Sequence, residues 1–243
     1  AKLALLDLDD AAMKETCELV KAEGSEAKGY VCNVTDEETV VASFQQIVND
    51  FGAVHGLVNN AGILRDATLI KVKDGKVVKK LSAENFSLVV DVHMKGAFLC
   101  TREAASHMVE QKIEEGCIIN MSSAAFRGNF GQTNYGAAKM AVLGLMNTLV
   151  IEGAKNNIKV NALAPTAGTR MTEDLMPSEI YDMLTSEAVT AGALALIHED
   201  SPTRHILCAG AGGYASTRLF ETDGIFLPAD QQSPENILSQ WDE

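Results

Sequence analysis

The stretch from Cys117 to Ile151 constrains the fold most, because it joins two apolar runs of different period through a loop of small residues. Cys117–Met121 is short and apolar, which is typical of a buried strand. Met140–Ile151 has apolar residues at helical spacing. The loop between them is rich in serine, glycine and alanine. The order predicts a strand, a tight connection and a long helix.

Other parts of the chain repeat this alternation of strand and helix. Strands are expected at residues 1–8, 29–32, 54–58 and 158–163, and helices at 11–22, 35–50 and 88–110. Thr35 and Glu38 have the spacing of a capping box at the start of the second helix. Strands and helices of these lengths, in alternation, predict an α/β fold with a parallel sheet covered on both faces.

Tyr135 and Lys139 are four residues apart on the long helix, so their side chains lie on one face. A free tyrosine has a pKa near ~10, and a nearby ammonium favours the phenolate and lowers that pKa. A tyrosine tuned in this way can exchange a proton with a hydroxyl or carbonyl oxygen. The pair alone is weak evidence, since this spacing also arises by chance. The other motifs in the chain give it weight.

The chain resembles the short-chain dehydrogenase/reductase family, whose members are single-domain Rossmann oxidoreductases with a Ser-Tyr-Lys centre. The resemblance covers nearly all of residues 1–243. It rests on segments that occur in a fixed order: L-L-D-L-D from Leu5, N-V-T-D from Asn33, L-V-N-N-A-G from Leu57, D-V-H-M-K-G from Asp91, S-S from Ser122, Y-G-A-A-K from Tyr135 and N-A-L-A-P-T-A-G-T-R-M-T from Asn161. It implies a doubly wound parallel sheet in one dinucleotide-binding domain.

One departure from the family concerns the start of the fold. The family begins with a strand, a glycine-rich phosphate loop and a helix. Here the sequence begins at what corresponds to the second strand, and the fold is therefore expected to lack the first strand and the glycine-rich loop. We expect an incomplete N-terminus; the alternative is a chain that does not hold a pyrophosphate in the usual way.

The resemblance also implies a set of cofactor-binding residues. Asp7 ends its strand where an acid accepts hydrogen bonds from ribose hydroxyls and repels a 2′-phosphate, which favours NAD over NADP; the alternative is a helix cap or turn. The other implied contacts are Asn33 and Val34 at the adenine, Asn60, Ala61 and Gly62 beside the adenosine, Tyr135 and Lys139 at the nicotinamide ribose, and Pro165, Thr166, Gly168 and Thr169 around the nicotinamide and diphosphate.

Two catalytic assignments need a choice. The spacing back from Tyr135 indicates Ser122, whereas the strand register from Gly116 indicates Ser123; only one of the two can face the site. We choose Ser123, because loops absorb deletions more easily than strands do. His93 replaces the family's usual asparagine and is expected to relay protons through water; simple packing is the alternative. The histidines lack metal-ligand spacing, so no metal is expected.

Four segments fall outside the common core. Residues 69–80 alternate Val or Ile with Lys around Asp74-Gly75, which predicts a β-hairpin. Two interpretations are open: the hairpin is exposed to solvent without a binding role, or its five lysines bind the phosphates of a carrier thioester. Residues 170–190 are expected to form a substrate lid. Its apolar contacts would be Met171, Leu175, Met176, Ile180, Tyr181 and Met183; the alternative is that these side chains only pack a helix. Cys208–Tyr214 predicts a glycine-turned hairpin, and residues 228–243 a polar tail.

Composition limits the function classes. The 243 residues carry a net charge of −13, which argues against non-specific binding to nucleic acid or to an anionic membrane surface. We expect no membrane span, because no apolar run approaches the ~18 residues required. Five cysteines without C-x-x-C pairs indicate a reducing compartment, and we expect a cytoplasmic protein.

From Gly128 onward the sequence resembles the (3R)-hydroxyacyl-CoA dehydrogenase part of peroxisomal-type multifunctional enzymes, and the hairpin resembles 3-oxoacyl-carrier-protein reductase relatives. The hypothesis is an NAD-dependent oxidation of a secondary alcohol, most simply a 3-hydroxyacyl thioester. In this hypothesis Tyr135 takes the proton, Ser123 holds the oxygen and Lys139 tunes Tyr135. The alternatives are another alcohol, such as a steroid or polyol, and a non-catalytic dinucleotide-binding scaffold. The family implies a homodimer or homotetramer.

Overall fold

The structure is a computed structural model, and it describes residues 1–169, 172 and 177–241. The strands are β1 Lys2–Asp7, β2 Glu26–Val31, β3 Gly56–Asn59, β4 Ile70–Lys73, β5 Lys76–Lys80, β6 Gly116–Met121, β7 Ile158–Pro165, β8 Ile206–Gly210 and β9 Gly213–Thr217. The helices are α1 Asp10–Ala22, α2 Glu37–Phe51, α3 Ala83–Val90, α4 Gly96–Glu110, α5 Thr133–Gly153, α6 Ser178–Met183, α7 Ser186–Ile197 and α8 Pro234–Leu238.

The parallel strands form two sheets rather than one. β1 pairs with β2, and β3-β6-β7-β8 are parallel with β9 added antiparallel at the edge. β1 and β3 each have one edge with no strand paired to it among the described residues. The predicted parallel α/β architecture is confirmed, and the predicted hairpin around Cys208–Tyr214 is β8-β9. The split lies where the standard dinucleotide order has one more strand, between β1 and β3.

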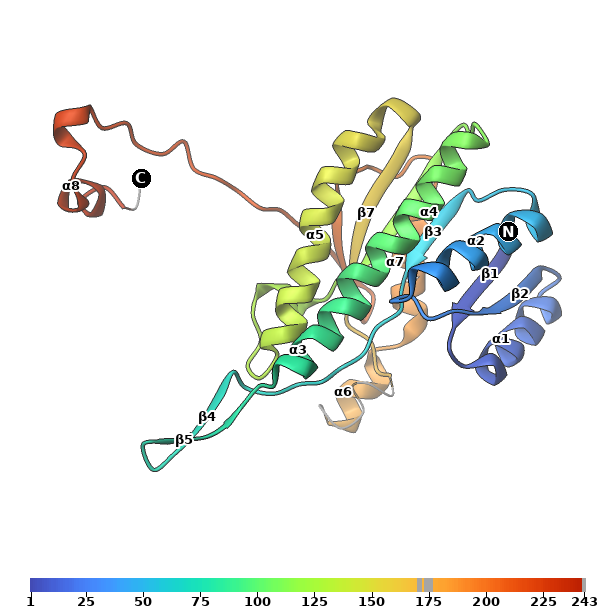
Figure 1. The fold of residues 1–243 in the computed structure, drawn as a ribbon, viewed down its shortest axis with the longest axis horizontal. Helices are drawn as coiled ribbons and strands as arrows, with labels where there is room; N and C mark the ends of the chain where they lie inside the picture. Colours follow the sequence, from blue (N-terminus) through green and yellow to red (C-terminus); the bar gives the residue numbers. More distant parts are fainter. Residues whose placement is uncertain (170–171, 173–176, 242–243) are drawn as a thin grey trace.

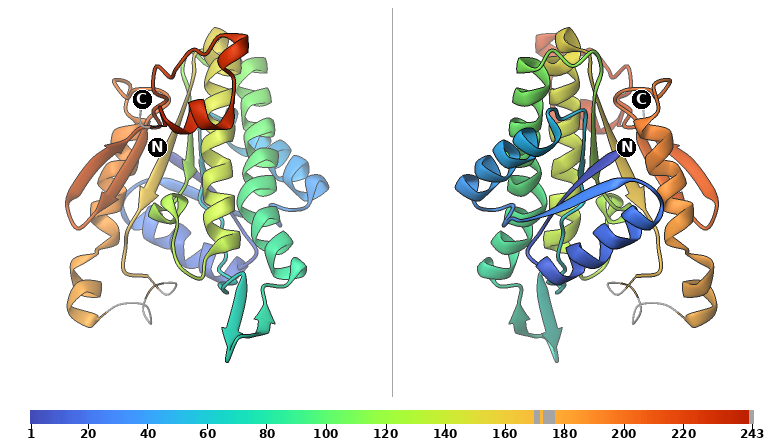
Figure 2. Two further views of the ribbon diagram at one scale, coloured as in Figure 1. Left: turned by 90° about the vertical axis from the view of Figure 1, so that its left-hand side faces the viewer. Right: turned by 90° about the vertical axis from the view of Figure 1, so that its right-hand side faces the viewer.

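The two faces of the larger sheet pack against different helices. Alternate residues of β6 point to opposite faces, so Ile118 joins one apolar cluster while Cys117 and Ile119 join the other. The first cluster contains buried side chains of α2, α4 and α5, and the second contains Leu196 of α7. Helices therefore cover both faces of the sheet, as Figures 1 and 2 show.

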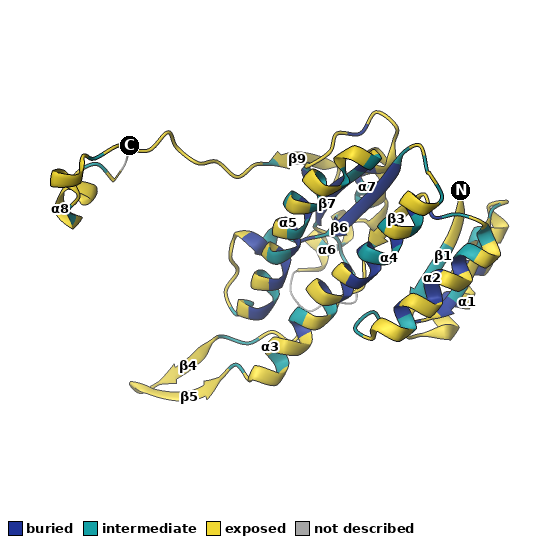
Figure 3. Cartoon of the chain, turned by 45° about the horizontal axis from the view of Figure 1, so that its top comes forward, coloured by how far each residue is buried: buried dark blue, intermediate teal, exposed yellow. Residues whose placement is uncertain are grey.

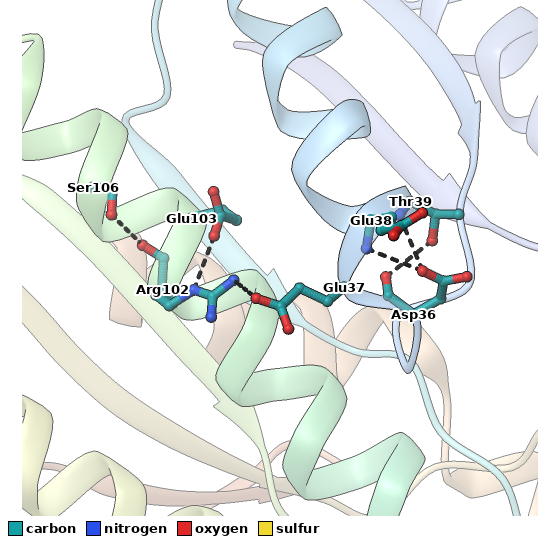
Figure 4. Close-up of polar contacts among 7 residues, drawn as sticks. All are labelled: Asp36, Glu37, Glu38, Thr39, Arg102, Glu103 and Ser106. Atoms are coloured by element: carbon teal, nitrogen blue, oxygen red, sulfur yellow. Dashed lines mark hydrogen bonds and ion pairs between the residues drawn. The ribbon is translucent and has the colours of Figure 1, made fainter.

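The same cluster also joins the two sheets. Tyr30 and Cys32, on and just after β2, share it with Phe44 of α2 and with Leu99 of α4. Arg102 of α4 adds a polar link, because its guanidinium reaches Glu37 of α2 at 2.8 Å (Figure 4). The sheets are thus held together by helices rather than by a shared hydrogen-bonded edge.

The start of α2 differs from the sequence prediction. Its N-cap is Asp36, whose carboxylate accepts hydrogen bonds from the backbone N–H groups of Glu38 and Thr39 at 3.0 and 3.2 Å (Figure 4). The predicted capping residue, Thr35, instead donates its hydroxyl to the amide oxygen of Asn33 at 2.9 Å. The capping box prediction was wrong because an Asx turn at Asn33 uses Thr35 first.

The helix predicted over residues 88–110 begins earlier and changes geometry on the way. α3 starts at Ala83, with Ser82 as its N-cap, and a π-helical turn over Asp91–Lys95 joins it to α4. Such turns insert an extra residue into the helical repeat and often occur at functional sites. His93 lies in the middle of this turn.

Two helical stretches are long and apolar enough to cross a membrane by length and composition, Thr133–Asn156 and Ser178–Ile197. This differs from the expectation that no such stretch exists, because alanine, glycine and leucine interspersed with polar residues give both stretches a high mean hydropathy without an unbroken apolar run. In the structure the first stretch includes α5, which carries the buried polar residues Asn134 and Lys139 and packs on β6 and β7.

Two segments extend from this body. The predicted hairpin is β4-β5, and its turn residues Asp74 and Gly75 both have positive φ, at 51° and 72°, as a type I′ turn requires. Figure 1 shows it projecting beyond the end of α3. The C-terminal segment after β9 runs away from the body to α8, and Figure 3 shows that both segments are largely exposed.

Substitution of Phe44 tests whether the two sheets unfold as one unit. Its ring is 2 % exposed in the cluster that joins them, so Phe44→Ala should lower the free energy of unfolding by about 3–5 kcal/mol in a single transition. Phe226→Ala is the matched control, because that ring is 89 % exposed and the change should be within ~0.5 kcal/mol. Urea unfolding followed by circular dichroism measures both; two separate transitions in Phe44→Ala would contradict a shared core.

Candidate active site

A pair of buried hydrogen bonds ties α5 to the carboxyl end of β6. The ammonium of Lys139 donates to the backbone carbonyl of Met121 at 2.6 Å, and the hydroxyl of Ser122 donates to the backbone carbonyl of Lys139 at 2.9 Å. Lys139 and Ser122 are both buried, so each bond satisfies a group that burial would otherwise leave without a partner. The helix and the strand end are thereby held in one register.

This register places Ser123 at Tyr135. Ser122 points into the helix contact, and Ser123, the next residue, points to the other side and hydrogen-bonds the side chain of Tyr135. The Ser123 hydroxyl also accepts from the N–H of Ala125 at 3.2 Å, which begins a 3-10 turn. Of the two serines, the one indicated by the strand register is therefore the one beside the tyrosine.

The electrostatics of Tyr135 differ from the sequence expectation. Burial raises the pKa of Tyr135, and the carboxylate of Asp66 raises it further, while the hydrogen bond with Ser123 lowers it. The ammonium of Lys139 lies over the tyrosine ring, 5.5 Å from the centroid, and donates to Met121 rather than to the phenol oxygen. Burial lowers the pKa of Lys139 to about 8.

His93 packs edge-on against the ring of Tyr135, with 5.2 Å between ring centroids. Its Nε2 lies 2.8 Å from the carbonyl oxygen and 3.1 Å from the N–H of Ile63, and its buried Nδ1 has no partner within the described residues. Burial, followed by the charge of Lys139, lowers the pKa of His93 to about 4. The imidazole is therefore neutral at physiological pH and can donate at one nitrogen and accept at the other.

Residues that the sequence analysis missed hold the start of α5 in place. The Asn134 side chain is fully buried; its amide donates to the carbonyl of Arg65 at 2.9 Å and its oxygen accepts from the N–H of Tyr135 at 2.9 Å. Asp66 accepts from the amide of Gln132 at 2.6 Å. The only sequence signal was the position of Asn134 directly before Tyr135.

The residues predicted to contact a dinucleotide follow the carboxyl ends of parallel strands. Asp7 ends β1, Asn33 and Val34 follow β2, Asn60–Gly62 follow β3, and Pro165–Thr169 end and follow β7. In an open parallel sheet this edge is where ligands bind. The structure thus brings Ser123, Tyr135, Lys139 and His93 into contact, and sets the predicted cofactor residues along the same edge of their strands.

Several of these residues already have partners in the fold. One oxygen of Asp7 accepts from the N–H of Asp9 at 3.0 Å, and the amide oxygen of Asn33 accepts from Thr35. Val34 packs against Gly96, where a Cβ would lie 2.8 Å from its methyl group. Gly62 is required by His93, since a Cβ there would lie 2.5 Å from the imidazole.

The segment after β7 is anchored at both ends. The N–H of Thr166 donates to Ala209 of β8 at 2.8 Å, and the N–H of Gly168 donates to Leu184 at 2.6 Å, just after α6. Ile180, Tyr181 and Met183 of the expected lid lie on α6; a Cβ on Gly168 would lie 2.6 Å from the carbonyl of Tyr181. The other expected lid contacts, Met171, Leu175 and Met176, lie outside the described residues.

The helix N-termini that follow the first two strands do not suit a diphosphate. Asp9 caps α1 by accepting from the N–H of Ala12 at 3.0 Å, and Asp36 caps α2 in the same way. Both helices also have acids in the first turn, which repel an anion. Within the described residues, then, neither of these helix N-termini forms a glycine-rich cradle for a diphosphate.

One cluster resembles a metal site in composition only. Ligand atoms of His198, Glu199 and Asp200 lie within 4.8 Å of one another, but all three residues are exposed. His198 Nδ1 also accepts from the N–H of Asp200 at 3.2 Å. We assign no metal to it.

Comparison with known proteins gives one family. The sequence profile of the short chain dehydrogenase family matches residues 1–179. The peroxisomal multifunctional enzyme A of Dictyostelium discoideum is 39 % identical over 95 % of this chain and 49 % of its own length. The 3-oxoacyl-[acyl-carrier-protein] reductase of Thermotoga maritima is 34 % identical over 88 % of this chain and 84 % of its own.

A solved structure agrees with these matches. A short chain dehydrogenase from Mycobacterium avium superposes with a TM-score of 0.81 at 27 % identity, over all of this chain and 85 % of that one. The chain spans about half the length of the Dictyostelium relative. The family resemblance found in the sequence is confirmed.

The buried, neutral His93 predicts a pH dependence of stability. Its pKa is about 4 in the folded chain and ~6.5 in the unfolded one, so between these values only the unfolded chain binds the proton. The free energy of unfolding should therefore fall as pH drops from 6.5 to 4, by up to ~1.4 kcal/mol per pH unit from this group.

The measurement is urea unfolding of the wild type and His93→Asn across this pH range. The substitution should flatten the pH slope, whereas His198→Asn, at an exposed histidine, should leave it unchanged. Equal slopes in the wild type and His93→Asn would contradict a buried neutral imidazole.

Proposed function

Because the chain belongs to the short-chain dehydrogenase family, we propose that it uses a nicotinamide dinucleotide to interconvert a secondary alcohol and a ketone, with a 3-hydroxyacyl or 3-oxoacyl thioester as substrate. The observation that carries the proposal is the contact of Tyr135 with both Ser123 and Lys139 at the carboxyl end of β6. An oxidoreductase of this kind needs a group that can give a proton to the substrate oxygen or take one from it, and Tyr135 is such a group.

In this mechanism Ser123 and Tyr135 both face the substrate oxygen. When bound, the nicotinamide supplies the hydride donor or acceptor. The Ser123 hydroxyl holds the substrate oxygen, and Tyr135 gives it a proton during ketone reduction or takes one during alcohol oxidation. Because the pKa of Tyr135 is raised, the phenol carries its proton at neutral pH, which suits reduction; oxidation is favoured as pH rises.

Lys139 and His93 act around this pair. The Lys139 ammonium has two further N–H groups besides the one bonded to Met121, and we assign them to the ribose of the nicotinamide. His93 Nδ1 is buried, polar and without a described partner, which suits a relay through water. Both roles follow the sequence prediction and are part of the proposal.

NAD is the proposed dinucleotide. The support is Asp7 at the end of β1, because a carboxylate accepts from ribose hydroxyls and repels the 2′-phosphate of NADP. The aspartate-capped N-termini of α1 and α2 do not provide a cradle for the diphosphate. The open edges of β1 and β3 lie where the standard order has the strand that carries such a cradle.

The proposal of a thioester substrate rests on similarity to two named relatives. The Thermotoga relative is named as a reductase of 3-oxoacyl carrier protein, and the other relative as a multifunctional peroxisomal enzyme. The substrate, like the activity of any longer protein that contains this chain, is therefore a proposal.

The assembly and the location are proposals as well. A homodimer or homotetramer built on α4 and α5 is supported by a groove along these helices that exposes apolar side chains, among them Phe98 and Val109. A cytoplasmic location is supported by five free cysteines, four of them buried; against it, the Dictyostelium relative is named peroxisomal.

The function is tested by NADH formation at 340 nm with a (3R)-hydroxyacyl-CoA and the full-length protein. We expect turnover with NAD, a much lower rate with NADP, and a loss of about 10²–10⁴-fold in kcat for Tyr135→Phe. Turnover of other secondary alcohols but of no thioester would refute the substrate class. NAD binding without turnover of any alcohol would leave a dinucleotide-binding scaffold as the function.

The two neighbouring serines provide a matched pair. Ser123→Ala should lower kcat by about 10²–10³-fold, because the substrate oxygen loses a hydrogen-bond donor, with little change in stability. Ser122→Ala should instead lower the free energy of unfolding by ~1–3 kcal/mol, because the buried carbonyl of Lys139 loses its donor. Kinetics and urea unfolding on both variants measure this; a larger loss of kcat in Ser122→Ala would reverse the assignment.

A further inference from the structure

The β4-β5 hairpin has two chemically different faces. Paired residues on antiparallel strands point to the same side, and the register pairs Lys71 with Lys79 and Lys73 with Lys76, one pair on each side of a register shift between Lys71 and Val72. Four lysines therefore share one face, which we call the four-lysine face. The opposite face carries Val72 paired with Val77 and Ile70 paired with Lys80, so it is mainly apolar with one lysine. All nine strand residues are exposed, and Figures 1 and 3 show the hairpin standing away from the body.

The charge on this hairpin is not compensated by the protein. Residues 70–80 hold five lysines and one aspartate, a net charge of +4, so the rest of the chain carries −17. Lysines elsewhere, such as Lys14 and Lys28, pair with carboxylates at 2.5–2.6 Å. Within the described part of the chain, none of the five hairpin lysines forms an ion pair. Like charges directly opposite one another destabilise a strand pair, so this face favours an anionic partner.

The base of the hairpin is fixed to the catalytic helix. Ala67 forms a parallel bridge with Gln132, Asp66 accepts from the Gln132 amide at 2.6 Å, and the carbonyl of Arg65 accepts from Asn134. Tyr135 is the next residue. β4 begins three residues after Ala67, at most ~11 Å of extended chain. The four-lysine face thus starts a short distance from the proton-transfer site and leads away from it.

We propose that the four-lysine face binds the phosphate groups of coenzyme A, the carrier of the acyl substrate. This inference rests on the thioester function proposed above. In an acyl-CoA the phosphates lie at the end of a long flexible arm, remote from the reacting carbon. A protein that binds both ends needs a cationic element displaced from Tyr135, and the hairpin is such an element. Lysine suits this role because its ammonium is a flexible point charge that binds phosphate.

The size of the face favours a compact polyanion over an acidic carrier protein. Paired lysines have Cβ atoms ~5 Å apart, and the two pairs are about 7 Å apart along the strands. A stable protein–protein contact takes about 20–30 residues on each partner, whereas this face has four lysines. The remaining surface is strongly acidic and repels phosphates, so the hairpin is also the part of the protein to which a polyanion is steered.

The direct test is calorimetric binding of free coenzyme A, without an acyl group, to the full-length protein at low salt. The variant replaces the lysines of the face together: Lys71→Gln, Lys73→Gln, Lys76→Gln and Lys79→Gln. We expect its affinity to fall at least about tenfold and its salt dependence to weaken. Lys→Arg at the same four positions should retain binding, and Val72→Thr on the opposite face is the matched control for hairpin folding.

Kinetics separate this proposal from the thioester function. In the four-Gln variant, the ratio of KM for a 3-hydroxyacyl-CoA to KM for the pantetheine thioester, which lacks the phosphates, should rise about tenfold. Equal affinity for coenzyme A in wild type and variant, or no binding by the wild type, overturns the hairpin proposal. A variant that loses only a carrier-protein substrate also overturns it. Lysine-dependent binding of coenzyme A without turnover of any thioester refutes the proposed thioester function but supports the proposal that the hairpin binds coenzyme A.

Discussion

The buried bond from the Lys139 ammonium to the carbonyl of Met121 is the constraint on which the site depends. A buried ammonium is strongly disfavoured unless it donates hydrogen bonds, and the last carbonyl of β6 accepts one. The reverse bond, from Ser122 to the carbonyl of Lys139, locks the same turn of α5 onto the same strand end. With strand and helix fixed, strand alternation leaves Ser123 facing Tyr135.

The rest of the fold supports this strand–helix pair. α4 and α5 pack on one face of the sheet, and the π-helical turn before α4 sets His93 against Tyr135 and against the backbone at Gly62. Asn134 ties the first turn of α5 to Arg65 and so to the loop that leads into the hairpin. Proton transfer, the neighbouring imidazole and the lysine-rich hairpin are therefore positioned by one connected set of contacts.

The sequence predicted the features that regular local patterns determine. Alternating periods predicted the α/β order, Asp74-Gly75 predicted the hairpin turn, and strand register favoured Ser123, which the structure places beside Tyr135. It did not predict effects that arise from packing or from competition between neighbouring turns. Burial raises the pKa of Tyr135 despite the neighbouring Lys139; the Asn33 amide oxygen accepts from Thr35, which leaves Asp36 to cap the helix; and a π-helical turn sets His93 against Tyr135. These depend on residues distant in sequence or on competing turns.

The most direct test is a crystal structure of the full-length protein with NAD and a 3-oxoacyl thioester. The account predicts that the 3-oxo oxygen lies within ~2.6–3.2 Å of both the Tyr135 phenol and the Ser123 hydroxyl. It also predicts that the ammonium of Lys139 keeps its bond to Met121. A substrate oxygen bound away from Tyr135, or bonded to Ser122 instead of Ser123, would contradict the central claim.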